Sequence, residues 1–437
     1  MSSVAPVAGA ASAETHAGQE FAGRWRDALF VAIFLLGWVS VSPFQPLSNA
    51  KLLEVGDTSD TLNQIAYVTL ATCAVAFFLR RPHALSLLLR PAYIAMSAWL
   101  LVSVATSNHP ALSLRRLIFT GCVILLAAAA PLLPSNRRRF VEPISASILI
   151  VLALCYVGVA LFPEVSIHQA DDLVEPRLAG NWRGLFDHKN IAGEMMAIFV
   201  FVGLFIARVR GAGLGWSIVL AAAFFLLFTE AKAAMGFLVL VLVLSPVVTG
   251  KGRFGLRVAV PLALWAGLNV LTVGSLFSPA LKTVNDLALS DPTFTGRNDI
   301  WQFATQHIPE RALLGHGFGA FWETDEIVYG DSMVKGDGPE SASHAHHALL
   351  DLALTTGIPG VALALLWAVA APVRDLRLCL AQGADSDLIM LFLRIWLFAL
   401  FNCIFESILF ARGDPLWFSM LVAMFGLRYL STWRLIA

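Results

Sequence analysis

The stretch LFDHKNIAGEMMAIFVFVGLFIARVR, residues 185–210, decides the fold because a long apolar run directly follows a charged segment. The run covers residues 191–207 and is followed by Arg208 and Arg210. A helix needs about 20 mostly apolar residues to cross a hydrocarbon core about 30 Å thick, and this run approaches that length. The stretch therefore predicts a membrane-spanning helix.

Similar runs recur along the whole chain, and together they predict an all-α, polytopic membrane protein with about 12 transmembrane helices. Of the 437 residues, 58% are hydrophobic and 14% are charged. In an ordinary soluble domain about 45–50% of the residues are apolar and about 25% are charged, so a soluble globular protein is excluded. The runs lie near residues 28–44, 63–79, 91–106, 116–134, 144–162, 191–207, 214–229, 233–249, 258–277, 347–370, 388–406 and 415–432.

Charge and cysteine content exclude further classes of protein. The 30 basic and 30 acidic residues balance, and no basic run with interleaved aromatic residues occurs, which argues against nucleic-acid binding. The five cysteines form no CxxC motif, and we interpret them as apolar packing residues.

The distribution of Lys and Arg predicts the orientation. With the amino terminus inside, most of the 30 basic residues fall in short inner segments, as the positive-inside rule requires. We therefore expect both termini in the cytoplasm, a disordered tail over residues 1–26 and a membrane domain over residues 27–437. The two long loops, about 163–190 and 278–346, then lie outside, and the second separates the ninth and tenth helices.

Cations gather in the first outer loop. The stretch RLAGNWRGLFDHKNIAGEMM, residues 177–196, contains Arg177, Arg183, His188 and Lys189. Guanidinium groups pair bidentately with phosphate oxygens and ammonium groups add point charges, so this loop is a candidate diphosphate site. The alternative is a solvated loop whose charges balance nearby acids.

Two shorter outer turns carry charges close to the membrane. TEAKAAMG, residues 229–236, holds Lys232 beside Glu230, so Lys232 either binds substrate or reaches water or Glu230. FESILFARGDPLW, residues 405–417, holds Glu406, Arg412 and Asp414, for which we favour a structural ion pair.

The second outer loop contains Arg297 at the start of a predicted helix and glycines at 315, 317 and 319. We expect these glycines to form a tight turn or to pack closely on the membrane domain, because no strand precedes them.

Three histidines end the second outer loop, in SASHAHHALLDLALTTGIPG, residues 341–360. A histidine at a helix start facing water suits general-base chemistry, since its ordinary pKa is about 6.5. His344 and His346 also have the spacing of a metal pair, but no carboxylate or cysteine completes a recognisable motif, so we predict no metal. A solvent-exposed histidine-rich loop is the alternative.

These motifs, over roughly residues 90–430, resemble the O-antigen ligase and Wzy-type polysaccharide polymerase superfamily. AHHALLDLALTTGIPG, residues 345–360, is similar to a family pattern of a histidine, an asparagine, an apolar stretch and Gly-x-x-Gly. GRNDIW and LLGHGFGAFW, residues 296–301 and 313–322, are less specific. LFDHKN, residues 185–190, is more similar to exopolysaccharide polymerases than to lipopolysaccharide ligases.

The resemblance implies a GT-C-like glycosyltransferase of the bacterial inner membrane, working at the periplasmic face without metal or cofactor. Such enzymes move a saccharide from undecaprenyl diphosphate to a sugar hydroxyl, with a histidine as base and arginines on the diphosphate. His346 matches the base, and Arg297 matches an arginine of the large outer loop. We add Arg177, Arg183, Lys189 and Lys232 as diphosphate-binding candidates, with His188, His344, Glu406 and Arg412 as further candidates.

Two positions depart from the family pattern. The turn residues Ala231, Lys232 and Ala233 replace a Ser-Arg-Gly of the ligases, and Lys232 lacks the guanidinium fork. His347 replaces the usual asparagine, which makes it a second candidate base.

The partners expected from the resemblance are a lipid-linked donor, a saccharide acceptor, the bilayer and chain-length or assembly proteins. Polymerase and ligase both remain open, and LFDHKN favours the polymerase. A polar-lipid transporter or flippase and a non-catalytic assembly protein are the alternatives from other classes. A transporter would require ionisable residues near the centre of the membrane, whereas the candidate site residues are all predicted to lie at the outer surface.

Overall fold

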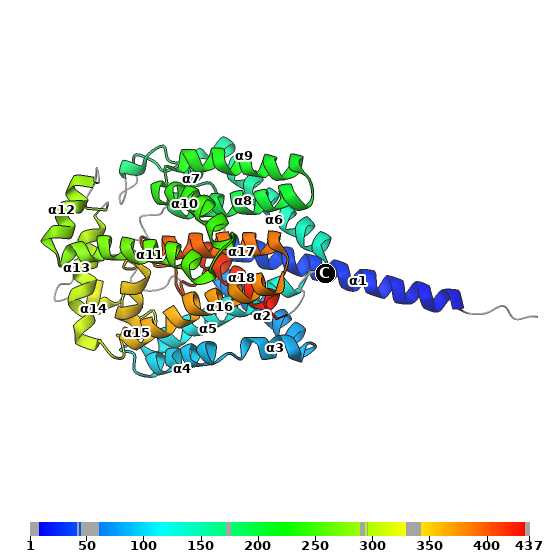
Figure 1. Ribbon diagram of the computed structural model, residues 1–437, viewed down its shortest axis with the longest axis horizontal. Helices are drawn as coiled ribbons and strands as arrows, with labels where there is room; N and C mark the ends of the chain where they lie inside the picture. The colour runs from blue at the N-terminus through cyan, green and yellow to red at the C-terminus, as the bar shows by residue number, and fades with distance from the viewer. Residues whose placement is uncertain are drawn as a thin grey trace, which may run out of the picture.

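The computed structural model describes residues 8–41, 43–44, 61–171, 176–288, 293–294, 296–328 and 342–432. Within this part the protein is helical, and the one β pairing is an isolated antiparallel bridge between Ile167 and Trp182 (Figure 1). The helices are α1 (Ala8–Trp38), α2 (Thr61–Leu79), α3 (Pro82–Leu88), α4 (Pro91–Ala105), α5 (Pro110–Ala129), α6 (Arg137–Leu161), α7 (Pro163–Ser166), α8 (Lys189–Val209), α9 (Ala212–Thr229), α10 (Lys232–Thr249), α11 (Phe254–Thr272), α12 (Pro279–Ala288), α13 (Arg297–His307), α14 (Asp325–Val328), α15 (Ala348–Leu365), α16 (Ala371–Gln382), α17 (Ser386–Asn402) and α18 (Pro415–Leu430).

Every predicted apolar run falls on a helix, so the chain is a multi-pass membrane protein, as predicted. Eight helices among the described residues are long and apolar enough to cross a membrane. A ninth span results if α3 and α4, which meet at 70°, count as one. The 17 residues of α17 and the 16 of α18 fall short of that length, so the total of twelve stays a prediction.

The helices differ in how much of their surface the protein covers. In α8, 78% of the most apolar window is buried, against 28% in α2 and 17% in α11. A helix that is apolar on all sides is stable in the centre of a bundle or against lipid. We therefore place α8 at the centre and the open faces of α2 and α11 towards the bilayer.

The predicted disordered tail differs from the structure. Residues 1–7 lie outside the described residues, but α1 is helical from Ala8 onwards. This segment is rich in alanine, which has the highest helix propensity of any residue. The first helix therefore begins well before the apolar run at residue 28.

The loop after α11 is helical, as predicted, and carries α12, α13 and α14 at one end of the molecule (Figure 1). The start of α1 projects from the opposite end. We call the end that carries α12, α13 and α14 the loop end. Residues 329–341 of the loop lie outside the described residues.

A kink in α15 fixes this loop to the membrane domain. Gly357 has φ 72° and ψ 174°, which interrupts the helical hydrogen bonds. The carbonyls of Leu354 and Thr355 accept hydrogen bonds from the backbone of His316 and Gly317, at 2.8 and 3.1 Å. A Cβ on Gly315 would lie 2.4 Å from the Thr355 carbonyl carbon. The glycine motif thus packs its backbone directly on α15, as expected from the sequence.

Candidate functional site

His346 lies in the short segment that leads into α15, and several contacts fix its backbone. Its φ of 47° lies in the left-handed region, which is strained for a non-glycine residue. The Asp351 carboxylate accepts hydrogen bonds from the Ala345 N–H at 3.1 Å and the Trp322 indole at 2.7 Å. The Trp301 indole donates to the His346 carbonyl at 3.4 Å. The backbone that carries the imidazole is therefore held in place by α15 and by the outer loop, including α13.

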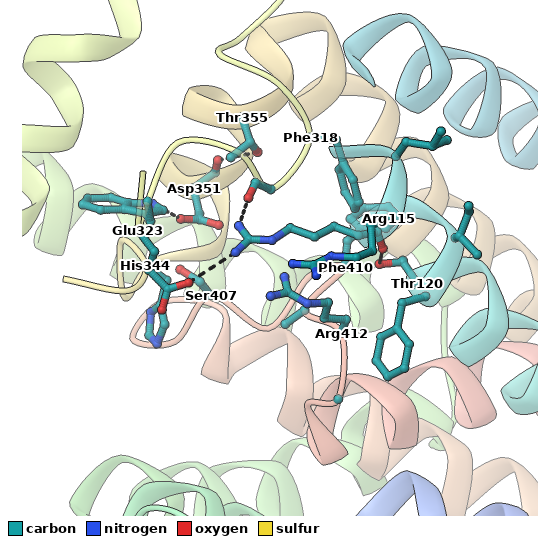
Figure 2. Close-up of a pocket in the computed structure, with 18 of the residues that line it drawn as sticks. Arg115, Thr120, Phe318, Glu323, His344, Asp351, Thr355, Ser407, Phe410 and Arg412 are labelled. Carbon is teal, nitrogen blue, oxygen red and sulfur yellow. Dashed lines mark hydrogen bonds and ion pairs between the residues drawn. The ribbon is translucent and has the colours of Figure 1, made fainter. Parts of the chain in front are cut away.

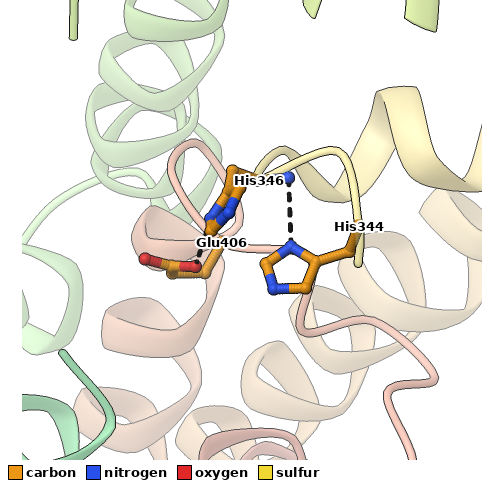
Figure 3. Close-up of side chains that lie close together, drawn as sticks. All are labelled: His344, His346 and Glu406. Atoms are coloured by element: carbon orange, nitrogen blue, oxygen red, sulfur yellow. Dashed lines mark hydrogen bonds and ion pairs between the residues drawn. The ribbon is translucent and has the colours of Figure 1, made fainter. Parts of the chain in front are cut away.

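Glu406 orients the His346 ring. His346 Nδ1 lies 3.1 Å from Glu406 Oε2, a distance at which an N–H donates to a carboxylate (Figure 3). A proton on Nδ1 leaves Nε2 as the basic nitrogen. The His346 side chain is 30% exposed and Glu406 17%, so the pair is accessible from one side.

Two more side chains converge on the same carboxylate. Arg297, the first residue of α13, donates from Nη2 to Glu406 Oε1 at 2.7 Å. Asn190, in the first turn of α8, donates to the same oxygen at 3.0 Å. Burial alone would raise the pKa of the Glu406 carboxyl, but the charges of Arg297 and His346 hold it below its ordinary value. Glu406 is therefore an anion that joins α8, α13 and the segment before α15.

His347 is a buried helix cap. Its Nδ1 accepts the Leu350 N–H at 3.3 Å, and its own N–H donates to Ser407 Oγ at 3.1 Å. Burial lowers the pKa of His347 to about 4, so the ring is neutral and able to accept. With 2% of its surface exposed, His347 has a structural placement, and His346 is the better candidate for proton transfer.

His344 completes a cluster whose ligand atoms lie within 4.8 Å of one another, together with His346 and Glu406 (Figure 3). Burial and the neighbouring His346 lower the pKa of His344 to about 3. Its Nδ1 accepts the His346 N–H at 3.2 Å, and both Glu406 oxygens are engaged. The donor set would suit a transition metal, but these contacts favour a proton-transfer pair, and metal independence stays a prediction.

Lys189 contacts the turn that precedes Lys232. Lys189 Nζ donates to the Glu230 carbonyl at 3.3 Å, in the turn that precedes Lys232. With the Asn181 nitrogen directed at Glu230 Oε2 (3.2 Å), the Asn181 oxygen accepts from Lys189 Nζ at 2.9 Å. Lys232 is exposed at the first position of α10. His188 caps α8 through Nδ1, which accepts the Asn190 N–H at 3.1 Å.

The two arginines of the first outer loop have different surroundings. Arg183 is 2% exposed and donates to the Phe186 and Asp187 carbonyls, at 3.3 Å each. This geometry favours a structural role in shaping the loop. Arg177 is exposed in the 3₁₀ turn Pro176–Leu178. Diphosphate binding by either residue stays a prediction.

Glu406 forms an ion pair, as its own stretch favours, and the partner Arg297 comes from the second outer loop. Its partners Arg297 and His346 lie 109 and 60 positions away in the sequence. Asn190 and Asp351 also escaped the sequence analysis. Acids inside an apolar run, such as Asp351 and the 3% exposed Glu194, give the signal that could have found this end of the bundle.

The fold and the site define a multi-pass helical membrane protein with a histidine–carboxylate pair and several cations at its loop end. A protein-family model described as O-antigen ligase matches residues 195–365. This region runs from α8 to α15 and includes Arg297 and His346, whereas Glu406 follows it. The match confirms that the chain carries a domain of the O-antigen ligase and Wzy-type superfamily. No curated protein matches the chain.

The cap assigned to His347 predicts how two substitutions differ. We expect His347→Ala to lower stability by about 1 kcal/mol, because the Leu350 N–H loses its acceptor. His347→Asn should keep most of that stability, since an asparagine oxygen also caps helices. Thermal unfolding of purified full-length protein in detergent measures both. Equal melting temperatures for the two variants would contradict the cap.

The lowered pKa values of His344 and His347 predict the pH dependence of stability. Below about pH 6.5 the unfolded chain binds protons that the folded chain does not bind. These two histidines therefore lower the free energy of unfolding as the pH is lowered. For His347 the loss continues down to about pH 4, at up to about 1.4 kcal/mol per pH unit. Burial raises the pKa of Asp414 to about 7, which contributes with the opposite sign but equally in wild type and in His347→Asn. The melting temperature of wild type relative to that of His347→Asn should therefore be constant from pH 8 to 7 and fall below pH 7. An unchanged difference between the two proteins down to pH 4 would refute this assignment.

Proposed function

We propose that this protein is a membrane glycosyltransferase that moves a saccharide from an undecaprenyl diphosphate carrier to a sugar hydroxyl. The reaction would take place at the periplasmic face of a bacterial inner membrane, where the orientation predicted from Lys and Arg puts the loop end. The family match supports a lipid-linked polysaccharide polymerase or ligase as the class of enzyme. The pair formed by His346 and Glu406 is the observation that carries the proposal.

His346 is suited to act as the general base. A sugar hydroxyl has a high pKa, so its attack on an anomeric carbon is faster when a base removes the proton. Glu406 accepts a hydrogen bond from Nδ1–H and stabilises the imidazolium that forms when Nε2 takes up the hydroxyl proton. The hydroxyl oxygen then bonds to the anomeric carbon as the bond to the diphosphate breaks. A single displacement of this kind inverts the anomeric configuration.

Arg297 is suited to stabilise the leaving diphosphate. The diphosphate leaves as an anion, and fixed cations lower the barrier by meeting the charge as it develops. A guanidinium has five N–H donors, and Glu406 holds that of Arg297 beside the base. Lys189, Lys232, Arg177 and Arg183 are the further cations that we assign to the carrier, with Arg183 the least accessible.

Two products remain as candidates. The similarity of LFDHKN to exopolysaccharide polymerases favours a Wzy-type polymerase, which joins one lipid-linked unit to another. The description of the matching family favours a ligase, which transfers a finished chain to lipid A core or to a protein. Both products require the same base and the same leaving group.

Substitution of the pair tests the reaction. We expect His346→Ala and Glu406→Gln to lower kcat by at least about 100-fold, because base catalysis contributes typically 10²–10⁴-fold. Release of undecaprenyl diphosphate from a lipid-linked saccharide, by purified protein with no energy source, measures this and separates catalysis from transport. His83→Ala, at the predicted cytoplasmic side, is the matched control. Full activity in His346→Ala at equal membrane levels would rule out the assigned base.

Arg297→Lys tests the guanidinium. Lysine keeps the charge but cannot pair with Glu406 and phosphate oxygens through a planar fork, so we expect at least a tenfold loss in kcat/KM. Arg377→Lys, an exposed position on α16, is the matched control and should be neutral. Equal activities in the two variants would count against diphosphate binding by Arg297.

A further inference from the structure

A second group of arginines lines a cavity next to the histidine–glutamate pair. The cavity has a volume of about 700 Å³ and lies between α2, α5, α15 and the turn that joins α17 to α18. Ligand-binding cavities in proteins have volumes of about 300–1,000 Å³. Figure 2 shows Glu323, His344 and Ser407 at one side of it, and Arg115, Phe410 and Thr120 at the other.

The cavity carries three guanidinium groups, from Arg115, Arg116 and Arg412. Arg116 is held in place by a hydrogen bond to the Gly319 carbonyl and an ion pair with Glu323 at 3.3 Å. Asp351 also lines the cavity, so its lining carries three arginines and two carboxylates. A phosphorylated headgroup with sugar hydroxyls needs such a mixture of cations and acceptors.

One wall of the cavity belongs to the lipid-facing surface. Val68 on α2 and Leu114 and Ile118 on α5 line it, and they are 53%, 47% and 57% exposed. Both helices are long and apolar enough to span the membrane. An amphiphile could therefore lie with its apolar chain against these residues and its headgroup among the arginines.

Neighbours of the reactive pair, though neither His346 nor Glu406 itself, line the cavity. His344 lines it, and the His344 ring centroid lies 4.0 Å from that of His346. Ser407, which follows Glu406 directly, lines it too. The described lining includes none of the five cations assigned above to the carrier of the donor. The cations of the cavity are thus a different set from the five assigned to the donor.

We propose that this cavity binds the acceptor: a lipid-anchored saccharide with a phosphorylated headgroup, distinct from the donor. The inference rests on the proposed function and adds a second substrate site to it. The acceptor hydroxyl would lie at His346 and give its proton to Nε2, while Arg115 and Arg412 hold the headgroup phosphate. Separate cation sets keep the two anionic substrates apart, because nearby like charges repel one another.

Binding measurements test the cavity independently of turnover. Full-length His346→Ala protein in detergent is mixed with undecaprenyl diphosphate, or with lipid A core glycolipid, and bound lipids are counted by native mass spectrometry. We expect either two molecules of undecaprenyl diphosphate, as for a polymerase, or one of these plus one glycolipid, as for a ligase. Adding Arg115→Ala and Arg412→Ala should remove one bound lipid and keep the other. Arg377→Ala should remove none.

A second variant guards against misfolding. Ile118→Trp adds bulk at a lipid-facing position that lines the cavity, so the fold should tolerate it while acceptor binding falls. In the catalytically intact protein it should raise the acceptor KM at least tenfold and leave the donor KM within twofold.

The outcomes separate the two proposals. Unchanged lipid counts in the arginine variant, or a rise in the donor KM alone, would overturn the acceptor site. If the His346→Ala protein with its arginines intact binds one lipid and no more, the site is likewise refuted. The third outcome combines two results: the arginine substitutions remove one bound lipid, and His346→Ala alone turns over normally. It would refute the proposed base but leave the acceptor site standing.

Discussion

The arrangement of this protein's loop end depends on one partly buried negative charge. An ionised carboxylate with little contact to water is stable only when charges and hydrogen bonds replace its hydration. For Glu406 these come from Arg297, His346 and Asn190, on three separate segments. Removing any one of them would leave part of the charge unmet. The carboxylate therefore requires α8, α13 and the segment before α15 to meet at one point.

A second constraint keeps those segments in place. The kink at Gly357 frees carbonyls of α15, and the backbone around Gly315 and Gly317 binds to them. This contact anchors the long outer loop and with it Arg297. Asp351, one turn into α15, holds the backbone before His346. The segments that carry the site are thus anchored to helices of the membrane domain, which suits chemistry that needs fixed positions.

Apolar runs predicted the helices well because a membrane span needs only length and low polarity, both of which are local properties. Helix ends were less predictable, as α1 begins at Ala8 and α5 already at Pro110. His346 and Arg297 could be proposed from motifs. The role of Glu406 could not, because its partners lie 109 and 60 positions away and no local pattern encodes such pairings.

If His346 serves separate donor and acceptor sites, as proposed, a consequence for chain growth follows. If acceptor and donor are both carrier-linked, each round leaves the longer chain on the carrier in the cavity lined by Arg115 and Arg412. The next round requires that chain on the Arg297 side, where its diphosphate can leave. The headgroup must then move past the segment that carries His344 and His346, where fewer fixed cations are available than in either set. A ligase avoids this step, because its acceptor leaves after one transfer. Growth by a polymerase would therefore be limited by movement of an anion between two sites.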